Sequence, residues 1–125
     1  VPVTLPDDVA ALLAIGRAET ASARAAEAEG RMNDASNARD EAIVHYRRTA
    51  MIRRDSYEAH AALADLEEKA GDDEAAVAHL LSARRLDDRR RDGERPDYET
   101  RLASLYERLA SKAKAAAERR SSAPF

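Results

Sequence analysis

Three histidines are the side chains best suited to chemistry in a chain that contains no cysteine. His45 and His79 hold matching places in two predicted helices, and His60 lies on a predicted helix between them. Zinc ligands must converge at about 2.0–2.1 Å from the metal, and histidines one helical pair apart do not favour that arrangement. We therefore expect no metal site and interpret all three histidines as ordinary, partly exposed residues.

Other catalytic signatures are also missing from the sequence. Residues 33–41, NDASNARDE, have some of the oxygen ligands of a calcium loop, but Ala38 and Arg39 break the alternate spacing that such a loop requires. The chain has no glycine-rich phosphate loop and no nucleophile motif. The many carboxylates lie on predicted helix faces, where we interpret them as solvating groups. The sequence thus predicts a protein that is not an enzyme and uses no cofactor.

A cluster of arginines near the C-terminal third could contact phosphates or an acidic peptide. Acidic residues are interleaved with it at positions 87, 88, 92 and 94, and it contains no aromatic residue that could stack on bases. We interpret residues 87–96 as a solvated, self-neutralised loop and keep nucleic-acid binding as a less favoured alternative. The members of this predicted basic patch are Arg84, Arg85, Arg89, Arg90, Arg91 and Arg95.

The composition predicts helices that position these side chains. The chain has 125 residues, which suits one domain, and its hydrophobic fraction of 44% contains much alanine, one Phe and no Trp. Alanine is the strongest helix former, and no proline occurs between residues 7 and 95. We therefore expect an all-α protein with a thin core.

Charge and hydropathy limit the class of protein further. Residues 1–83 carry 9 Lys and Arg against 16 Asp and Glu, whereas residues 84–125 carry 12 against 8. No apolar run approaches the roughly 18 residues of a membrane span, and residues 1–16 lack the basic start of a signal peptide. Heavy use of arginine and alanine suggests a GC-rich bacterial genome. We expect a cytoplasmic bacterial protein with no membrane span.

The hydrophobic periodicity and the turn signals together predict five helices. The first extends from about residue 7 to the low thirties, and a polar turn at 33–37 follows it. Gly71 is predicted to separate the third helix from the fourth, because glycine suits the left-handed conformation that ends a helix. The other helices are predicted over about 38–53, 57–70, 73–86 and from 96 into an alanine- and lysine-rich segment.

The second and fourth predicted helices repeat at a spacing of 34 residues. Ala76 aligns with Ala42, and Val77 aligns with Ile43. The same shift places His79 on His45, Leu80 on Tyr46 and Gly71 on Asn37.

A 34-residue period of paired helices resembles the tetratricopeptide repeat (TPR) family, and the resemblance is best over residues 38–109. Asp88 stands where the family usually has proline, and Glu67 where it has an aromatic residue. In the first unit, Glu29-Gly30 takes the family's Leu-Gly position, although Ile15-Gly16 would fit better before a long insertion. The matching residues are Leu63, Ala64, Gly71, Asp72, Ala76, Leu80 and Ala83, and again Leu102, Ala103 and Tyr106.

The resemblance implies a short α-solenoid of about five helices, with long helices capping both ends. Residues 1–37 would form the N-terminal cap, residues 38–89 the repeats, and residues 90–125 a basic loop and the C-terminal cap of one domain. Helices of this kind stack because no single pair buries its own apolar face.

The resemblance also implies a groove lined by the first helix of each pair. Chaperone-binding TPR proteins hold a terminal carboxylate there with lysine and asparagine, but this chain has Glu58 and Asp65. We therefore expect an acidic groove for a basic or amphipathic helical segment. The predicted groove residues are Tyr57, Glu58, Ala61, Asp65, Glu68, Lys69, Tyr98 and Arg101.

These features favour a non-catalytic protein–protein interaction module, a scaffold or adaptor that binds a peptide or a protein subunit. An alternative is a structural subunit that self-assembles, as a homo-oligomer or within a larger complex, through its alanine-rich helices at 7–30 and 110–120. The third alternative is a nucleic-acid-associated protein that uses the arginines near the C-terminus.

Overall fold

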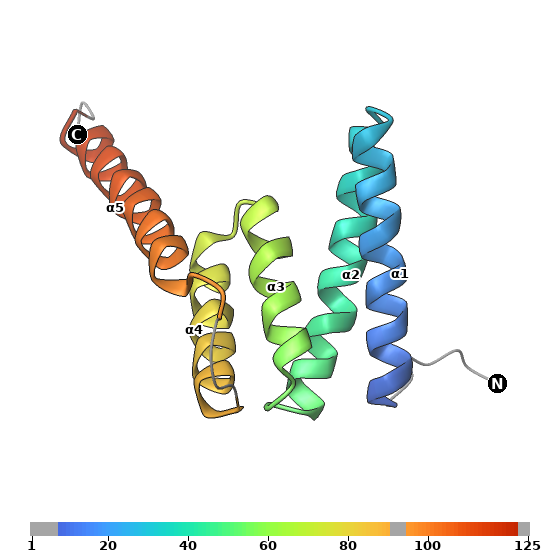
Figure 1. The fold of residues 1–125 in the computed structure, drawn as a ribbon. Helices are drawn as coiled ribbons and strands as arrows, with labels where there is room; N and C mark the ends of the chain where they lie inside the picture. Colours follow the sequence, from blue (N-terminus) through green and yellow to red (C-terminus); the bar gives the residue numbers. More distant parts are fainter. Residues whose placement is uncertain (1–7, 91–94, 123–125) are drawn as a thin grey trace.

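The computed structural model describes residues 8–90 and 95–122, and all regular structure within them is α-helical. The all-α prediction is therefore confirmed for this part of the chain. Consecutive helices lie side by side in the order of the sequence, with α1 against α2, α2 against α3, α3 against α4, and α4 against α5 (Figure 1). The helices are α1 (Val9–Ala28), α2 (Met32–Ile52), α3 (Tyr57–Lys69), α4 (Asp73–Arg90) and α5 (Tyr98–Ser122).

Local signals explain where most of the helices begin and end. The Asp8 side chain accepts a hydrogen bond from the backbone N–H of Ala10 at 2.9 Å, and the Ser56 hydroxyl oxygen accepts one from Ala59 at 3.3 Å. Both contacts satisfy backbone donors that a helix start leaves free. After α1 and α3 the chain reverses at Gly30, with a φ of 76°, and at Gly71, with a φ of 87°. The turn predicted at Gly71 is thus confirmed.

The turn predicted at residues 33–37 is wrong, because these residues lie inside α2. The polar residues of this segment are exposed, whereas Ala35 is fully buried, so the segment forms an amphipathic turn of helix. The reversal occurs earlier, at Gly30. The predicted boundary at residue 37 therefore falls within a helix.

The C-terminal end of α4 also differs from the prediction. The helix continues to Arg90, four residues beyond the predicted end, and Asp87 is fully buried instead of solvated. Residues 91–94 of the predicted loop lie outside the described residues, and residues 95 and 96 precede α5.

In the first hairpin, α1 is seven residues longer than α3 of the second hairpin, and α2 has seven more residues than α4 between the glycine turn and the matching buried alanine. Ala42 follows Gly30 by twelve positions, whereas Ala76 follows Gly71 by five. Seven extra residues correspond to about two helical turns. We call residues 20–38 the hairpin extension. Its inner side is filled by three buried alanines: Ala23, Ala26 and Ala35.

Residues 34 positions apart in α2 and α4 have matching burial. Ala42 and Ala76 are both fully buried, and Tyr46 is as inaccessible as Leu80. Ala42 belongs to an apolar cluster formed by α2 and α3, and Ala76 belongs to a separate cluster formed by α3, α4 and α5. The sequence period of 34 residues therefore coincides with matching burial at these positions. None of the helices within the described residues combines the length and the apolar character that a membrane crossing requires.

Candidate binding groove

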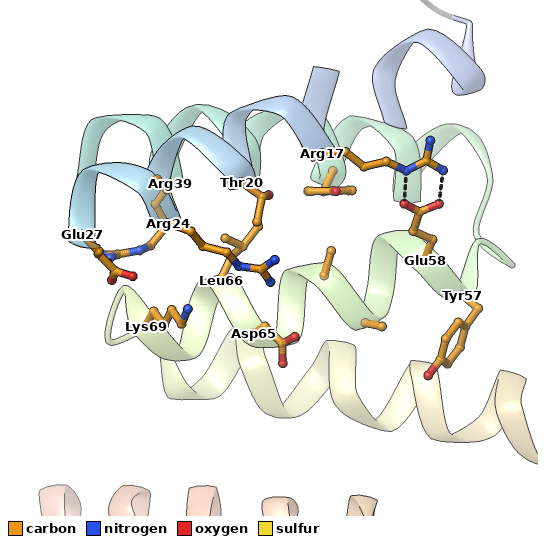
Figure 2. A pocket seen from close by; sticks show the side chains of 14 residues that line it. Arg17, Thr20, Arg24, Glu27, Arg39, Tyr57, Glu58, Asp65, Leu66 and Lys69 are labelled. Carbon is orange, nitrogen blue, oxygen red and sulfur yellow. Dashed lines mark hydrogen bonds and ion pairs between the residues drawn. The ribbon is translucent and has the colours of Figure 1, made fainter. Parts of the chain in front are cut away.

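A groove with a volume of about 360 Å³ lies mainly between α1 and α3 (Figure 2). Five of the predicted groove residues on α3 line it, which places this part of the predicted site at a concave surface. Sequence reasoning did not identify the residues of α1 and α2 that form the rest. The lining comprises Arg17, Thr20, Ala23, Arg24, Glu27, Arg39, Tyr46, Tyr57, Glu58, Ala61, Ala62, Asp65, Leu66 and Lys69.

The apolar part of the lining comes from three helices. Ala23 of α1, Tyr46 of α2 and Leu66 of α3 are all buried. Gly16 allows the Tyr46 ring to approach α1, because a Cβ atom at Gly16 would lie 2.8 Å from the ring carbon Cζ. Burial raises the pKa of the Tyr46 hydroxyl, while a hydrogen bond with Thr20 acts in the opposite direction. The phenol is therefore neutral at pH 7.

Two ion pairs stand along the edges of the groove. The Arg17 guanidinium donates two hydrogen bonds to the Glu58 carboxylate, and this contact raises the pKa of Arg17 (Figure 2). Nη2 of Arg39 donates to Oε1 of Glu27 at 2.9 Å. Paired in this way, Glu58 does not present a free negative charge to a ligand.

The other two carboxylates of α3 among the predicted groove residues are paired with arginines of α5. Nη2 of Arg101 lies 2.6 Å from Oδ1 of Asp65, and Nη2 of Arg108 lies 2.7 Å from Oε2 of Glu68. Glu68 itself lies outside the main groove, in a shallower depression beside it. The expected acidic groove is therefore not what the structure shows, because arginines from two other helices offset the carboxylates of α3.

Arg24 and Lys69 are the two lining cations that make no hydrogen bond or ion pair with other described residues. They project from α1 and α3 in the part of the groove away from Arg17, where Glu27 and Arg39 also lie, and in this view the Arg24 guanidinium lies between Lys69 and Asp65 (Figure 2). The lining thus has four cationic and three anionic side chains, and its unpaired charges are both positive.

Two predicted groove residues on α5, Tyr98 and Arg101, lie outside the groove lining. Tyr98 is buried, and its hydroxyl donates to Oδ2 of Asp87 at 2.6 Å. Its oxygen can then accept from the Tyr57 hydroxyl, 2.9 Å away. Burial, reinforced by Asp87, raises the pKa of Tyr98 strongly. Tyr98 therefore joins α3, α4 and α5 in the core.

Two of the histidines bind carboxylates at equivalent places in the two hairpins. Nδ1 of His45 lies 2.6 Å from Oε1 of Glu19, and Nδ1 of His79 lies 2.5 Å from Oε1 of Glu67. Arg47 donates to the other oxygen of Glu67, at 2.8 and 3.1 Å. Glu67 is fully buried, so the interpretation of carboxylates as solvating groups is wrong here.

His60 differs from the expected exposed residue because it is buried. Its Nε2 lies 2.8 Å from the Arg54 carbonyl oxygen, and its ring centroid is 5.5 Å from that of His79. Across residues 8–90 and 95–122, no three His, Asp or Glu side chains are grouped so that they could hold a metal ion.

The described members of the predicted basic patch do not form a uniform cationic surface. Arg84 lies 3.8 Å from Glu99, and Arg95 pairs with Asp88 at 3.1 Å and with Glu99 at 2.7 Å. Arg85 and Arg89 are exposed on α4. The side chain of Arg90 and the whole of Arg91 lie outside the described part of the chain. Interleaved acidic residues thus offset Arg84 and Arg95.

The groove is a concave, partly apolar surface in which most charges are already paired. Such a surface can hold a side chain of a ligand against its apolar part and orient it by the charges at its edges. No family model, curated protein or solved structure matches this chain. The groove and its charges are consequently the main indication of what the molecule does.

Proposed function

We propose that this chain is a TPR-like, non-catalytic interaction module that binds a peptide or protein segment in the groove between α1 and α3. The observation that carries the proposal is an apolar lining, formed by Ala23, Tyr46 and Leu66, between paired charges. The resemblance to the TPR family supports it, because first helices line the groove in that family. Here α1 and α3 are the first helices of the two hairpins.

The chemistry of the lining favours binding over catalysis. Glu58 and Glu27 are each occupied by an arginine, and the Tyr46 hydroxyl is a neutral phenol with a raised pKa. None of the described lining residues is a histidine. A general acid or base needs a pKa near the operating pH and access to the substrate. The lining offers fixed charges and apolar contacts instead.

The walls of the groove are held in place before a ligand arrives. The Arg17–Glu58 pair connects α1 to α3, and Tyr46 packs against Gly16 beneath them. A preformed surface loses little conformational entropy on binding, so more of the contact energy appears as affinity.

Peptide display against the folded chain tests this proposal. Peptides selected in this way should lose at least about tenfold in affinity for an Ala62→Phe variant, because a large side chain would fill the groove. Ala78→Phe is the matched control, since Ala78 is exposed on α4 and is not part of the lining. Failure to select any peptide, or equal binding to both variants, would count against a binding groove.

Self-assembly is a second candidate function, favoured by a specific feature of the two end helices. The outer side of α1 exposes alanines at helical spacing, and the second half of α5 projects beyond the other helices (Figure 1). Light scattering over a range of concentrations checks this candidate, and a constant monomer mass contradicts it. The exposed alanines of α1 are Ala10, Ala14, Ala18, Ala21, Ala25 and Ala28.

A further inference from the structure

The hairpin extension supplies much of the groove. Three lining residues of α1, Thr20, Ala23 and Arg24, are in the part of the helix that a hairpin as short as α3/α4 would lack. The extension therefore carries the α1 side of the groove over the C-terminal half of α3. It also brings Arg24 to the same end of the groove as Lys69 (Figure 2).

Helix stability accounts for one of these two cations but not for the other. Lys69 is in the last turn of α3, where a positive charge interacts favourably with the helix dipole. Arg24 is in the interior of α1, a turn before its end, and makes no ion pair with described residues. Its long side chain extends over the groove without a carboxylate partner.

The carboxylates that line the groove and the depression beside it are bonded to other arginines, and among them Glu27, one turn after Arg24 on α1, is bonded to Arg39. Asp65 shares the neighbouring depression with Arg24 and Lys69, but it is bonded to Arg101. Glu68 lies in the same depression and is bonded to Arg108. A negative charge for Arg24 and Lys69 must then come from outside these described groups.

We propose that the ligand of this groove is an acidic protein segment in which carboxylate side chains flank an apolar one. This proposal rests on the proposed binding function and specifies its ligand. The apolar side chain lies against Ala23, Tyr46 and Leu66, and the carboxylates accept hydrogen bonds from Arg24 and Lys69. Charge-assisted contacts of this kind are shorter and stronger than neutral ones. The partner is thus acidic, the reverse of the basic segment expected from α3 alone.

Two sets of short peptides, capped at both ends, test the proposal by fluorescence anisotropy. In one set aspartate and glutamate flank leucine, isoleucine or phenylalanine, and in the other set lysine and arginine replace the acidic residues. The caps remove the terminal charges, so only the side chains contribute charge to each peptide. We expect the acidic set to bind at least about tenfold more tightly, with affinity falling as salt is added.

Charge-reversal variants connect this preference to the two cations. An Arg24→Glu, Lys69→Glu variant should lose affinity for the acidic peptides and gain affinity for the basic peptides. Arg85→Glu, Arg89→Glu changes the net charge equally on the exposed surface of α4 and should leave both sets unchanged. Circular dichroism checks that each variant is folded.

The outcomes separate this proposal from the binding function itself. If basic or neutral peptides bind as tightly as acidic ones, and the Ala62→Phe variant loses affinity for them, the acidic ligand is overturned but the groove remains a binding site. Absence of binding by either set would overturn both. Tighter binding of a single-stranded oligonucleotide, lost in the Arg24→Glu, Lys69→Glu variant, would replace the acidic protein segment with a nucleic acid.

Discussion

The two hairpins of this molecule use the same core positions but have different lengths. In both, a small residue follows the glycine turn on the second helix, and the next helical turn contributes a large one: Ala42 and Tyr46 in α2, Ala76 and Leu80 in α4. The first hairpin adds seven residues to α1 and seven residues between the turn and Ala42 of α2 without changing this arrangement. Seven residues are close to two whole turns, so the added residues keep the same side toward the partner helix.

This difference shows how a groove can be added to a repeating fold. The inner side of the extension needs only alanines to continue the contact between α1 and α2, because short side chains let helices approach closely. The side of α1 that lines the groove is then available for residues such as Thr20 and Arg24. The second hairpin ends at Gly71 and carries no comparable extension.

Shortening the first hairpin should have the largest effect. Deletion of residues 20–26 together with 32–38 would give α1/α2 the same spacing from turn to core residues as α3/α4 and keep Glu19, Gly30 and Ala42 in phase. We expect this variant to unfold cooperatively but to lose the ligands of the groove altogether, because Arg24 and much of the α1 wall are gone.

Deletion of 20–24 alone is the contrasting change. It rotates the end of α1 by more than a third of a turn relative to α2, so Ala26 should no longer face its partner helix. We expect a broad, non-cooperative thermal transition by circular dichroism. Equal behaviour of the two deletions would contradict the importance of helical phase.

The buried carboxylate of the second hairpin should give the next largest effect. An Arg47→Met substitution leaves Glu67 fully buried with His79 as its only described partner, and we expect a loss of about 3 kcal/mol in the free energy of unfolding. Glu67→Leu should cost much less, because the Arg47 side chain is half exposed and can return to water. Denaturant unfolding of both variants measures the difference, and equal losses would disagree with this account.

Two substitutions can give the first hairpin, at Gly16 and Tyr46, the side chains that the second hairpin has in Ala64 and Leu80. Gly16→Ala should destabilise the protein by about 1–3 kcal/mol, because the new methyl group overlaps the Tyr46 ring. Adding Tyr46→Leu should recover part of that loss, since the second hairpin combines Ala64 with Leu80 in one cluster. A double-mutant cycle measures the coupling, and additive losses would show that the two sites are independent.

The smallest effect should appear in the response of the two hairpins to pH. The hydrogen bond from Lys112, supported by Arg108, lowers the pKa of Asp73 below its ordinary value of 3.8. Asp73 therefore stabilises the folded state above that value, and its contribution is lost as the pH falls through the lowered pKa. Burial raises the pKa of Glu19 above 4.5, so its contribution is greatest below 4.5 and declines as the pH rises through the raised value.

Carboxyl NMR titration of these two residues checks the opposite directions. Lys112→Met should move the pKa of Asp73 back toward 3.8, because it removes the largest cause of the shift. Lys114→Met is the control, since Lys114 is exposed and makes no described ion pair. A pKa for Asp73 that does not respond to the loss of Lys112 would contradict the assigned cause.

Much of the fold could be predicted from local patterns, and the main error has a definite cause. Gly71 was identified as a turn because glycine tolerates the left-handed conformation, and the helix predicted over about 57–70 agrees with α3, which begins after the capping residue Ser56. The first turn was misplaced because the polar residues at 33–37 were interpreted as a turn signal, and the shift of 34 residues, which aligns Asn37 with Gly71, assumes hairpins of equal length. The better fit of Ile15-Gly16 before a long insertion was the signal for the extension.

The groove was predicted only on the helix where the sequence pattern was strongest. Glu58 and Asp65 line the groove, but the prediction counted their charges without Arg17 and Arg101, which are 41 and 36 positions away in the chain. Arg24 had no local feature that distinguishes it from other surface arginines. Sequence spacing does not indicate which charges meet across helices.

The sequence by itself determined the helices, the turn at Gly71 and the apolar side of each helix, because hydrogen bonding, backbone preference and periodicity act over a few residues. Only the tertiary structure decided that Glu67 and Asp87 are buried, that the carboxylates of α3 are paired, and that Arg24 and Lys69 share one end of a groove. Electrostatic interactions depend on distance in space and on exclusion of water. Both are set by how the helices pack against one another.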